Sequence, residues 1–425
     1  MGRNGCGTGF VSLSGMRIQD KHPTSRHRSV PVCAFGRVLL VLFLTAFVQT
    51  TPAAAQMPGW TGDYGSILDD PDTAAQGERA LRYIYDMRPA DAVAVIDSLK
   101  ARYPGHPMGP FLDGLVIWWE ILPVISVGDT SLDDDFFRAM ERTVKAADRI
   151  DDKYALDGVF FKAAAIGFRG RHLSNRREWL KAARDGKTAL DLVFNLAERD
   201  PDNPDFQFGV GVYNYFASAI PREYPVVKPV MYFFPKADPA AGIATLERVS
   251  QDASFVGTEA AYFLLQIYLG FEPDYDNALR VVTMLRERHP ANAFFHVLEG
   301  RVYSRWGRFS SAAETYQDAI GLFQEGAPGY SSGVAQNALY NLARSRMAAG
   351  DLDQALVEFD QLEEVASTDE RSVFRAMGRL RAGMALDRLG RRPEAELAYR
   401  KVLDLPKVSD SHDLAKRYLK SPFGS

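Results

Sequence analysis

The residues Gly329 to Gly333 read GYSSG, which fits the G-x-S-x-G pattern around the nucleophilic serine of many hydrolases. That chemistry needs a strand before the serine, and an acidic residue and a histidine after it, in a parallel sheet. Here the motif lies between two predicted helices, and His412 is the one histidine that follows it. We therefore predict a loop in which Ser332 caps the next helix, and no esterase activity.

The other residues with catalytic or metal-binding potential form no recognisable site either. The sequence has no H-E-x-x-H motif and no glycine-rich phosphate loop. Pro290 separates His289 from His296, so these two do not share a continuous helical face. The acidic run at residues 133–135 starts a helix, where carboxylates stabilise the positive end of the helix dipole. We predict a protein that is not an enzyme and that binds no metal or cofactor.

The N-terminus has the pattern of a secretory signal. Arg26, Arg28 and Arg37 precede the apolar run Val38 to Val48, which is too short to span a bilayer, and the small-residue stretch TTPAAAQ follows it. We predict a signal peptide over residues 1–55 and export to the periplasm or cell envelope. An uncleaved membrane anchor is the alternative.

The chain after residue 55 has the composition of an ordinary globular protein. Both cysteines, Cys6 and Cys33, belong to the signal, so no disulfide is expected in the mature part. That part carries 44 basic and 53 acidic residues, a formal charge of −9, which gives no reason to expect nucleic-acid binding. No strand-like alternation of useful length occurs, so we predict an all-α fold without a transmembrane span.

A repeated spacing organises the C-terminal half of the chain. When Gly300, Ala343 and Gly383 are aligned, a glycine recurs seven residues on, an alanine twelve residues on and an aromatic residue sixteen residues on. These positions are Gly307, Gly350 and Gly390; Ala312, Ala355 and Ala395; and Tyr316, Phe359 and Tyr399. The small residues let two antiparallel helices approach closely, the glycine ends the first helix, and the aromatic residue fills the gap to the next unit.

The three stretches, EGRVYSRWGRFSSAAETYQDAI among them, resemble the tetratricopeptide repeat, a helix-turn-helix unit of about 34 residues. The resemblance implies a right-handed superhelix (α-solenoid) of antiparallel helix pairs. It also implies a non-enzymatic scaffold that binds a protein or peptide partner in a concave groove lined by the first helices. We expect irregular helical repeats over residues 56–205 and the regular array over residues 206–425.

An insertion interrupts this array. Gly211 and Gln266 also fit the repeat frame, but their separation exceeds one period by about the 21 residues of the stretch 218–238. That stretch holds four prolines and the aromatic residues Tyr224, Tyr232, Phe233 and Phe234. It packs against the array, docks a partner or makes a peripheral contact with a membrane, and the sequence leaves all three open. The insertion is similar to that of bacterial exported repeat proteins and, more remotely, of the eukaryotic outer-membrane tetratricopeptide proteins.

Helical counting places one edge of each first helix on the predicted groove, which would be apolar with a basic seam. The residues expected to line it are Phe294, Arg301, Arg305, Asn337, Tyr340, Arg344, Met384 and Arg388. Members of the family clamp peptide carboxylates with basic and amide side chains, so the resemblance implies an acidic or C-terminal peptide as the partner. Alternatively, these arginines only pair with local acids.

Two further features suggest other ligands. A second basic cluster over residues 169–187 is either a solvated face or a site for phosphate or lipid headgroups. Trp118 and Trp119, together with the insertion, suggest the alternative function of an envelope-associated accessory protein that handles lipid or glycan.

Overall fold

The computed structural model describes residues 66–125, 129–150, 155–223, 228, 234–369 and 372–424. The predicted signal peptide (1–55) lies outside these residues, and so do Tyr224, Tyr232 and Phe233 of the insertion. Within the described ranges all regular elements are helices and none is a strand, which confirms the all-α prediction.

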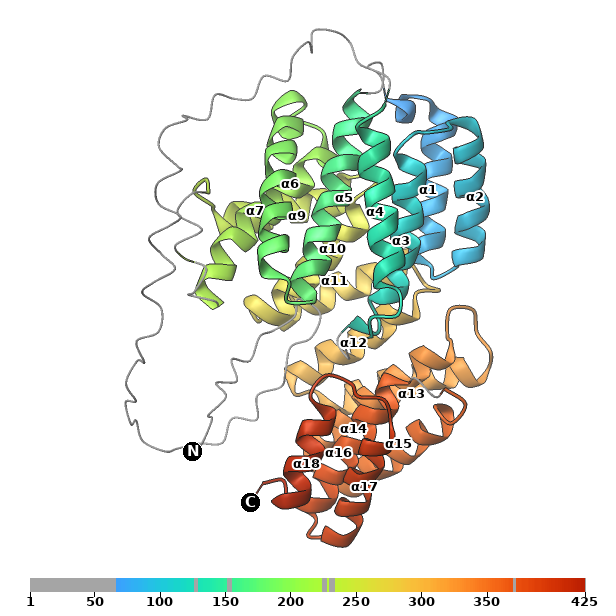
Figure 1. Ribbon diagram of the computed structural model, residues 1–425, viewed down its shortest axis with the longest axis vertical. Helices are drawn as coiled ribbons and strands as arrows, with labels where there is room; N and C mark the ends of the chain where they lie inside the picture. Colours follow the sequence, from blue (N-terminus) through green and yellow to red (C-terminus); the bar gives the residue numbers. More distant parts are fainter. Residues whose placement is uncertain are drawn as a thin grey trace. The chain divides into compact units, whose positions relative to one another are not determined.

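The helices follow one another as packed neighbours (Figure 1). After a 3-10 turn at Ile67–Asp69, the first six are α1 (Pro71–Tyr85), α2 (Pro89–Arg102), α3 (Met108–Ile121), α4 (Asp133–Ala147), α5 (Ala155–Asn175) and α6 (Trp179–Arg199). The next five are α7 (Pro204–Glu223), α9 (Pro239–Asp252), α10 (Gly257–Gln266), α11 (Tyr275–Arg288) and α12 (Ala293–Trp306), with a π-helical turn at Ile267–Phe271 after α10. The last six are α13 (Phe309–Gln324), α14 (Ser332–Ala349), α15 (Leu352–Val365), α16 (Val373–Arg388), α17 (Arg392–Asp404) and α18 (Ser411–Lys420).

The repeated small and aromatic residues hold the helix pairs of the array together. The glycines that follow α12, α14 and α16 all adopt positive φ, with values of 79° at Gly307, 90° at Gly350 and 74° at Gly390. A Cβ atom at Gly300 would lie 2.5 Å from Cε1 of Tyr316, and one at Gly383 would lie 2.5 Å from Cε1 of Tyr399. Only glycine therefore fits beneath these two buried tyrosine rings.

The helix before the insertion is longer than the sequence suggested. We expected it to end before Ser218, but α7 continues to Glu223 and contains Pro221 in its last turn. A proline at this place removes one backbone hydrogen bond, and the helix ends two residues later, so the cost stays local.

The C-terminal end of the insertion is fixed to α7 and α9, the helices on either side of it. Tyr213 of α7 donates a hydrogen bond of 2.6 Å from its hydroxyl to the carbonyl of Pro235, and Phe234 is half-buried. The Asp238 side chain accepts hydrogen bonds from the first backbone N–H groups of α9 and so caps this helix. This part of the insertion packs against the array.

Candidate protein-interaction groove

Half of the predicted groove residues are buried inside the array. Phe294, Asn337, Tyr340 and Met384 expose only 4–6% of their surface. The Phe294 ring lies 6.3 Å from that of Tyr262, and the Tyr340 ring lies 5.7 Å from that of Phe374. These four side chains contribute to packing between repeats.

The end of α3 and the turn after it cover part of this surface. The Trp119 ring lies 5.4 Å from that of Phe295 in α12, and Val124 packs against the hydrophobic cluster that contains Tyr340. Asn337 of α14 donates a hydrogen bond of 3.1 Å from Nδ2 to the carbonyl of Pro123, across 214 positions of sequence. One end of the predicted groove is therefore covered by the protein's own chain.

Both tryptophans of α3 are buried, Trp118 against Phe136 and Phe168 and Trp119 against Phe295. Trp118 is 0% exposed and Trp119 is 1% exposed. Trp119 also donates a hydrogen bond of 3.1 Å from Nε1 to Oε1 of Glu259. Neither side chain can contact a lipid or glycan in this conformation, contrary to the alternative prediction.

Polar residues on one face of α14 connect the covered end of the groove to its arginines. Asn341 donates a hydrogen bond of 2.6 Å from Nδ2 to Oδ1 of Asn337, and its own Oδ1 accepts one of 3.3 Å from Nη1 of Arg344. The Arg344 guanidinium also lies over the Tyr340 ring, 5.4 Å from its centroid. These neighbours orient Arg344 and leave its charge without a carboxylate partner in the part of the chain that the structure describes.

The other predicted arginines fall into two kinds. Arg305 donates a hydrogen bond to the carbonyl of Leu269 at 3.4 Å, and the exposed Arg388 donates one to the carbonyl of Met347 at 3.3 Å. Arg301 is half-buried and has neither a hydrogen bond nor an ion pair with any described residue. Arg301 therefore resembles Arg344 in lacking an acid.

Arg381 of α16 completes an arginine cluster, which we define as Arg301, Arg344 and Arg381. Arg381 is half-buried, its Nε is buried without a partner, and it has no ion pair among the described residues. Sequence reasoning did not name Arg381, although it lies one helical turn before Met384 and therefore on the same face of α16.

Arg344 lies close enough to each of the other two arginines for their charges to act on it. Burial lowers the pKa of Arg344, and the positive charges of Arg381 and Arg301 lower it further. Burial also lowers the pKa of Arg301. The hydroxyl of Tyr316, beside both Arg301 and Arg344, is buried without a hydrogen-bond partner. A partly desolvated cluster of cations with no acid beside it is favourable for binding an anion.

Much of the second basic cluster is paired within the protein. Arg169 forms a two-pronged ion pair with Asp185 at 2.6 and 2.8 Å, and Arg176 forms one with Asp133 at 2.7 and 2.8 Å. His172 contacts Asp133 at 2.8 Å. Burial opposes ionisation of Asp133, but the hydrogen bonds from His172 and Arg176 outweigh it and lower the pKa of this carboxyl. These paired groups give no phosphate or lipid site.

The serine motif is part of a helix start, with one difference from the prediction. Helix α14 begins at Ser332, so the capping position is Ser331, whose side chain makes no capping hydrogen bond. Ser332 instead accepts a hydrogen bond of 3.1 Å from Nε2 of Gln336. The prediction that Ser332 caps the helix is therefore wrong, and the side chain of Ser331 does not cap it either.

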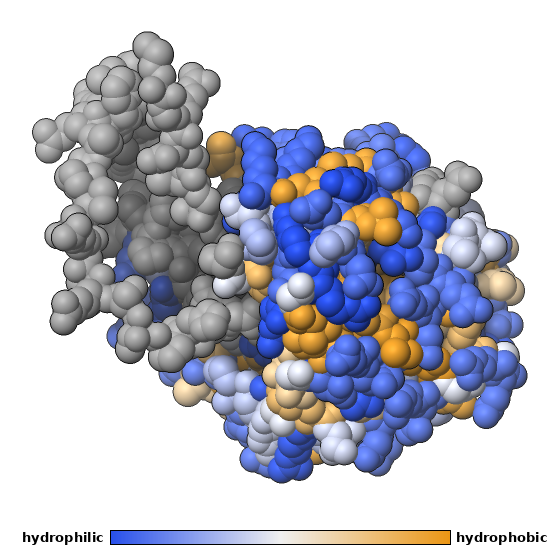
Figure 2. Space-filling view, turned by 90° about the horizontal axis from the view of Figure 1, so that it is seen from below, coloured by the Kyte–Doolittle hydropathy of each residue, from blue (hydrophilic) through white to orange (hydrophobic). Residues whose placement is uncertain are grey.

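The most exposed large hydrophobic side chains of the described residues are spread over several helices. Among the described residues, four large hydrophobic side chains are more than 40% exposed, and they belong to four different helices: Val93, Leu180, Val357 and Leu397. Figure 2 shows a face on which polar side chains predominate and apolar ones appear in patches between them. Hydrophobic side chains exposed singly are normal on protein surfaces. None of the described helices is both long enough and apolar enough to cross a membrane.

Comparison with known proteins agrees with the geometry of the helix pairs. Residues 337–365, which cover most of α14 and all of α15, match the family model of the tetratricopeptide repeat. This match confirms the resemblance of the α14–α15 helix pair to the tetratricopeptide repeat. No curated protein matches it in sequence.

Several solved structures are similar to this chain at low sequence identity. A Rap protein in complex with competence and sporulation factor is 13% identical, with a TM-score of 0.44 over 82% of this chain and 93% of that one. A human IFIT1 dimer with m7Gppp-AAAA is 14% identical, with a TM-score of 0.36 over 84% and 86%. A tetratricopeptide repeat protein from Parabacteroides merdae is 11% identical, with a TM-score of 0.31 over 71% and 95%. Similarities at this level do not indicate what the present chain binds.

Proposed function

We propose that this protein is an exported, non-enzymatic scaffold that binds an acidic segment of a protein partner at the arginine cluster. The observation that carries the proposal is the absence of any carboxylate beside Arg301, Arg344 and Arg381 within the described residues. Export rests on the signal-like residues 1–55, and periplasm or cell envelope is the proposed location.

The preference for an acidic partner follows from the energetics of half-buried cations. A charge that has lost part of its hydration is costly unless an opposite charge or hydrogen-bond acceptors replace the water. Guanidinium groups bind carboxylates through two parallel hydrogen bonds, which adds geometric selectivity. A carboxylate at this place would also give the buried Tyr316 hydroxyl an acceptor.

The preference for a polypeptide comes from the way the covered end of the groove holds the chain's own segment. There an asparagine of α14 binds the backbone carbonyl of Pro123, and the neighbouring Val124 packs on apolar side chains. The same helix face continues through Asn341 to Arg344. A partner segment could therefore use amide-to-carbonyl bonds and apolar contacts of the same kind while its acids reach the arginines.

The first test measures binding of a fluorescein-labelled peptide of alternating glutamate and alanine by fluorescence anisotropy. We expect saturable binding that weakens as salt is raised, because ions screen the attraction. The double variant Arg344→Gln/Arg381→Gln should bind at least about tenfold more weakly, since each change removes charged hydrogen bonds. Arg400→Gln is the matched control, because Arg400 is an exposed arginine of α17 that pairs with Glu396. Absence of binding, or equal binding by the double variant, refutes the proposal.

A second test searches for the natural partner in intact cells. A photo-reactive amino acid at Ala348 would report on the groove, because this exposed residue lies one turn beyond Arg344 on α14. We expect a discrete protein adduct that disappears in the Arg344→Gln/Arg381→Gln background and persists with Arg400→Gln. An adduct that survives the double variant would show that the partner does not depend on the arginine cluster.

A further inference from the structure

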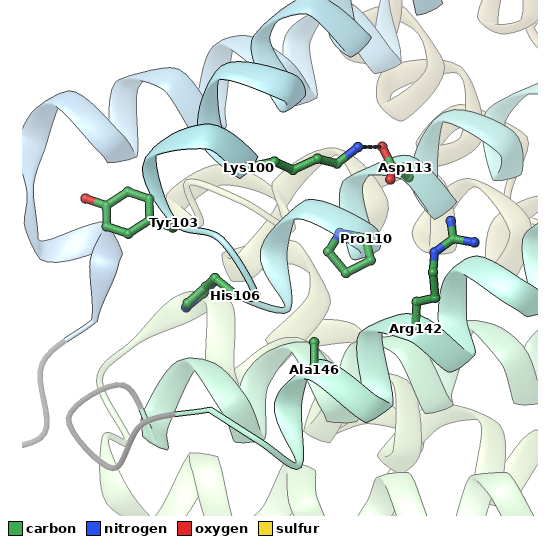
Figure 3. A pocket seen from close by; sticks show the side chains of 8 residues that line it. Lys100, Tyr103, His106, Pro110, Asp113, Arg142 and Ala146 are labelled. Carbon is green, nitrogen blue, oxygen red and sulfur yellow. Dashed lines mark hydrogen bonds and ion pairs between the residues drawn. The ribbon is translucent and has the colours of Figure 1, made fainter.

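A separate pocket of about 390 Å³ lies between α2, α3 and α4. Its lining includes Lys100 and Tyr103 at the end of α2, His106 from the following loop, Pro110 of α3, and Arg142 and Ala146 of α4. Figure 3 shows these side chains around the opening, with Tyr103 and His106 on one side and Arg142 on the other. The volume falls within the range of small-molecule sites, at its lower end.

One wall of the pocket is held in a fixed orientation. His106 is buried, and its Nδ1 accepts a hydrogen bond of 3.2 Å from the backbone N–H of Met108. Its Nε2 therefore carries the proton and faces Oδ2 of Asp157 at 3.2 Å. Asp157 is itself buried and accepts a hydrogen bond of 2.8 Å from the N–H of Ile67. A wall fixed in this way needs no rearrangement when a ligand enters.

The opposite side of the pocket carries one uncompensated positive charge. Lys100 contacts Oδ1 of Asp113 at 2.7 Å, so these two charges offset each other. On α4, Arg138 pairs with Asp135, and Lys145 pairs with Glu141 at 2.8 Å. Arg142, between them, has no ion pair or hydrogen bond with any residue in the described ranges. Figure 3 places its guanidinium on the same side as the Lys100–Asp113 pair.

We propose that this pocket binds a small monocarboxylic acid with an apolar body. The carboxylate would pair with Arg142, with Lys100 as the neighbouring donor, since guanidinium groups favour planar carboxylates. The apolar body would lie against Pro110 and Ala146. One net positive charge in the pocket matches one negative charge on the ligand. The pocket is lined by α2, α3 and α4, whereas the arginine cluster lies on α12, α14 and α16. The proposal therefore does not depend on the proposed function.

The test compares acids with their uncharged amides. Acetate, 4-methylpentanoate, phenylacetate and indole-3-acetate, each paired with its amide, would be titrated by isothermal calorimetry and by chemical-shift perturbation. We expect at least one acid with an apolar body to bind with 1:1 stoichiometry, at least about tenfold more tightly than its amide and than acetate, because a charged hydrogen bond distinguishes them. If every acid binds with a Kd above about 10 mM, the proposal is refuted.

Two variants connect binding to the pocket. Arg142→Gln should weaken binding of the acid about tenfold, and its matched control Arg138→Gln, one turn away on α4, should leave binding unchanged. Ala146→Leu places a larger side chain in the pocket and should exclude the ligand. Arg142 is exposed and unpaired, so its replacement should leave thermal unfolding unchanged. Equal affinity in Arg142→Gln, or equal affinity of an acid and its amide, would show that the charge has no role.

Discussion

Replacing Glu259 with glutamine should destabilise the protein strongly, because it leaves the buried Arg171 without its counter-charge. The two side chains are 3% and 9% exposed, and Nη1 of Arg171 lies 3.7 Å from Oε2 of Glu259. The guanidinium also lies over the Phe263 ring, 4.3 Å from its centroid. Breaking one partner of a buried ion pair typically costs about 3–5 kcal/mol. Glutamine keeps an oxygen for the Trp119 hydrogen bond, so Glu259→Gln isolates the loss of charge.

Removing the other partner of the pair, in Arg171→Met, should destabilise the protein by an amount that depends on pH. Burial raises the pKa of Glu259 and lowers that of Arg171. An acid whose pKa is higher in the folded protein than in the unfolded chain favours folding at low pH, and this contribution is lost as pH rises through the folded value. In Arg171→Met, Glu259 can take up a proton, so the destabilisation should shrink as pH falls. In Glu259→Gln, Arg171 stays charged at every accessible pH, and the destabilisation should persist.

Urea unfolding followed by circular dichroism at pH 5 and pH 8 would measure both effects. The double variant Arg171→Met/Glu259→Gln removes both charges and should be more stable than Glu259→Gln alone, which defines the coupling between the two residues. A cost below about 0.5 kcal/mol for Glu259→Gln would contradict the reasoning, since that is typical of a surface substitution. The same pH dependence in both single variants would also contradict it.

Three further predictions concern packing and protonation. Gly300→Ala should lower stability by about 1–3 kcal/mol in thermal unfolding, because its Cβ would lie 2.5 Å from the Tyr316 ring. The control Gly321→Ala should be neutral or stabilising, because no atom lies within 4 Å of the added Cβ. His296 is buried, and burial lowers its pKa to about 4. The unfolded chain therefore binds a proton at this residue before the folded protein does, so stability falls by roughly 3 kcal/mol as pH falls from 6.5 toward 4. His296→Gln should lose this pH dependence of the unfolding free energy, and an unchanged profile would contradict the prediction. Trp119→Ala should cost about 3–5 kcal/mol and increase amide exchange in α12, because the indole contacts Phe295 across the groove; exchange confined to α3 would argue against that link.

The features that sequence predicted correctly are those determined by neighbours within one repeat. A glycine seven residues after a small residue ends a helix with positive φ, as at Gly307 and Gly350, because the spacing alone fixes its place in the turn. The contact of Gly300 with Tyr316 follows in the same way, since both belong to one helix pair. Local spacing did not reveal that α7 would continue through Pro221, because a proline near a helix end costs too little to stop it.

The groove was harder to predict because its lining depends on contacts between distant segments. Periodicity identified the face of α14 that carries Asn337 and Arg344 but gave no sign that Pro123, 214 residues before Asn337, would bind there. This contact gives one face of α14 two different ends, which hydrogen bonds from Asn337 through Asn341 to Arg344 connect. At one end Asn337 binds the chain's own backbone, and at the other Arg344 presents a cation with no acid beside it. A partner that enters from the arginine end would meet cations that have no acid beside them and the Tyr316 hydroxyl, which has no hydrogen-bond partner among the described residues. Its acids, more than its backbone, would then determine whether it binds.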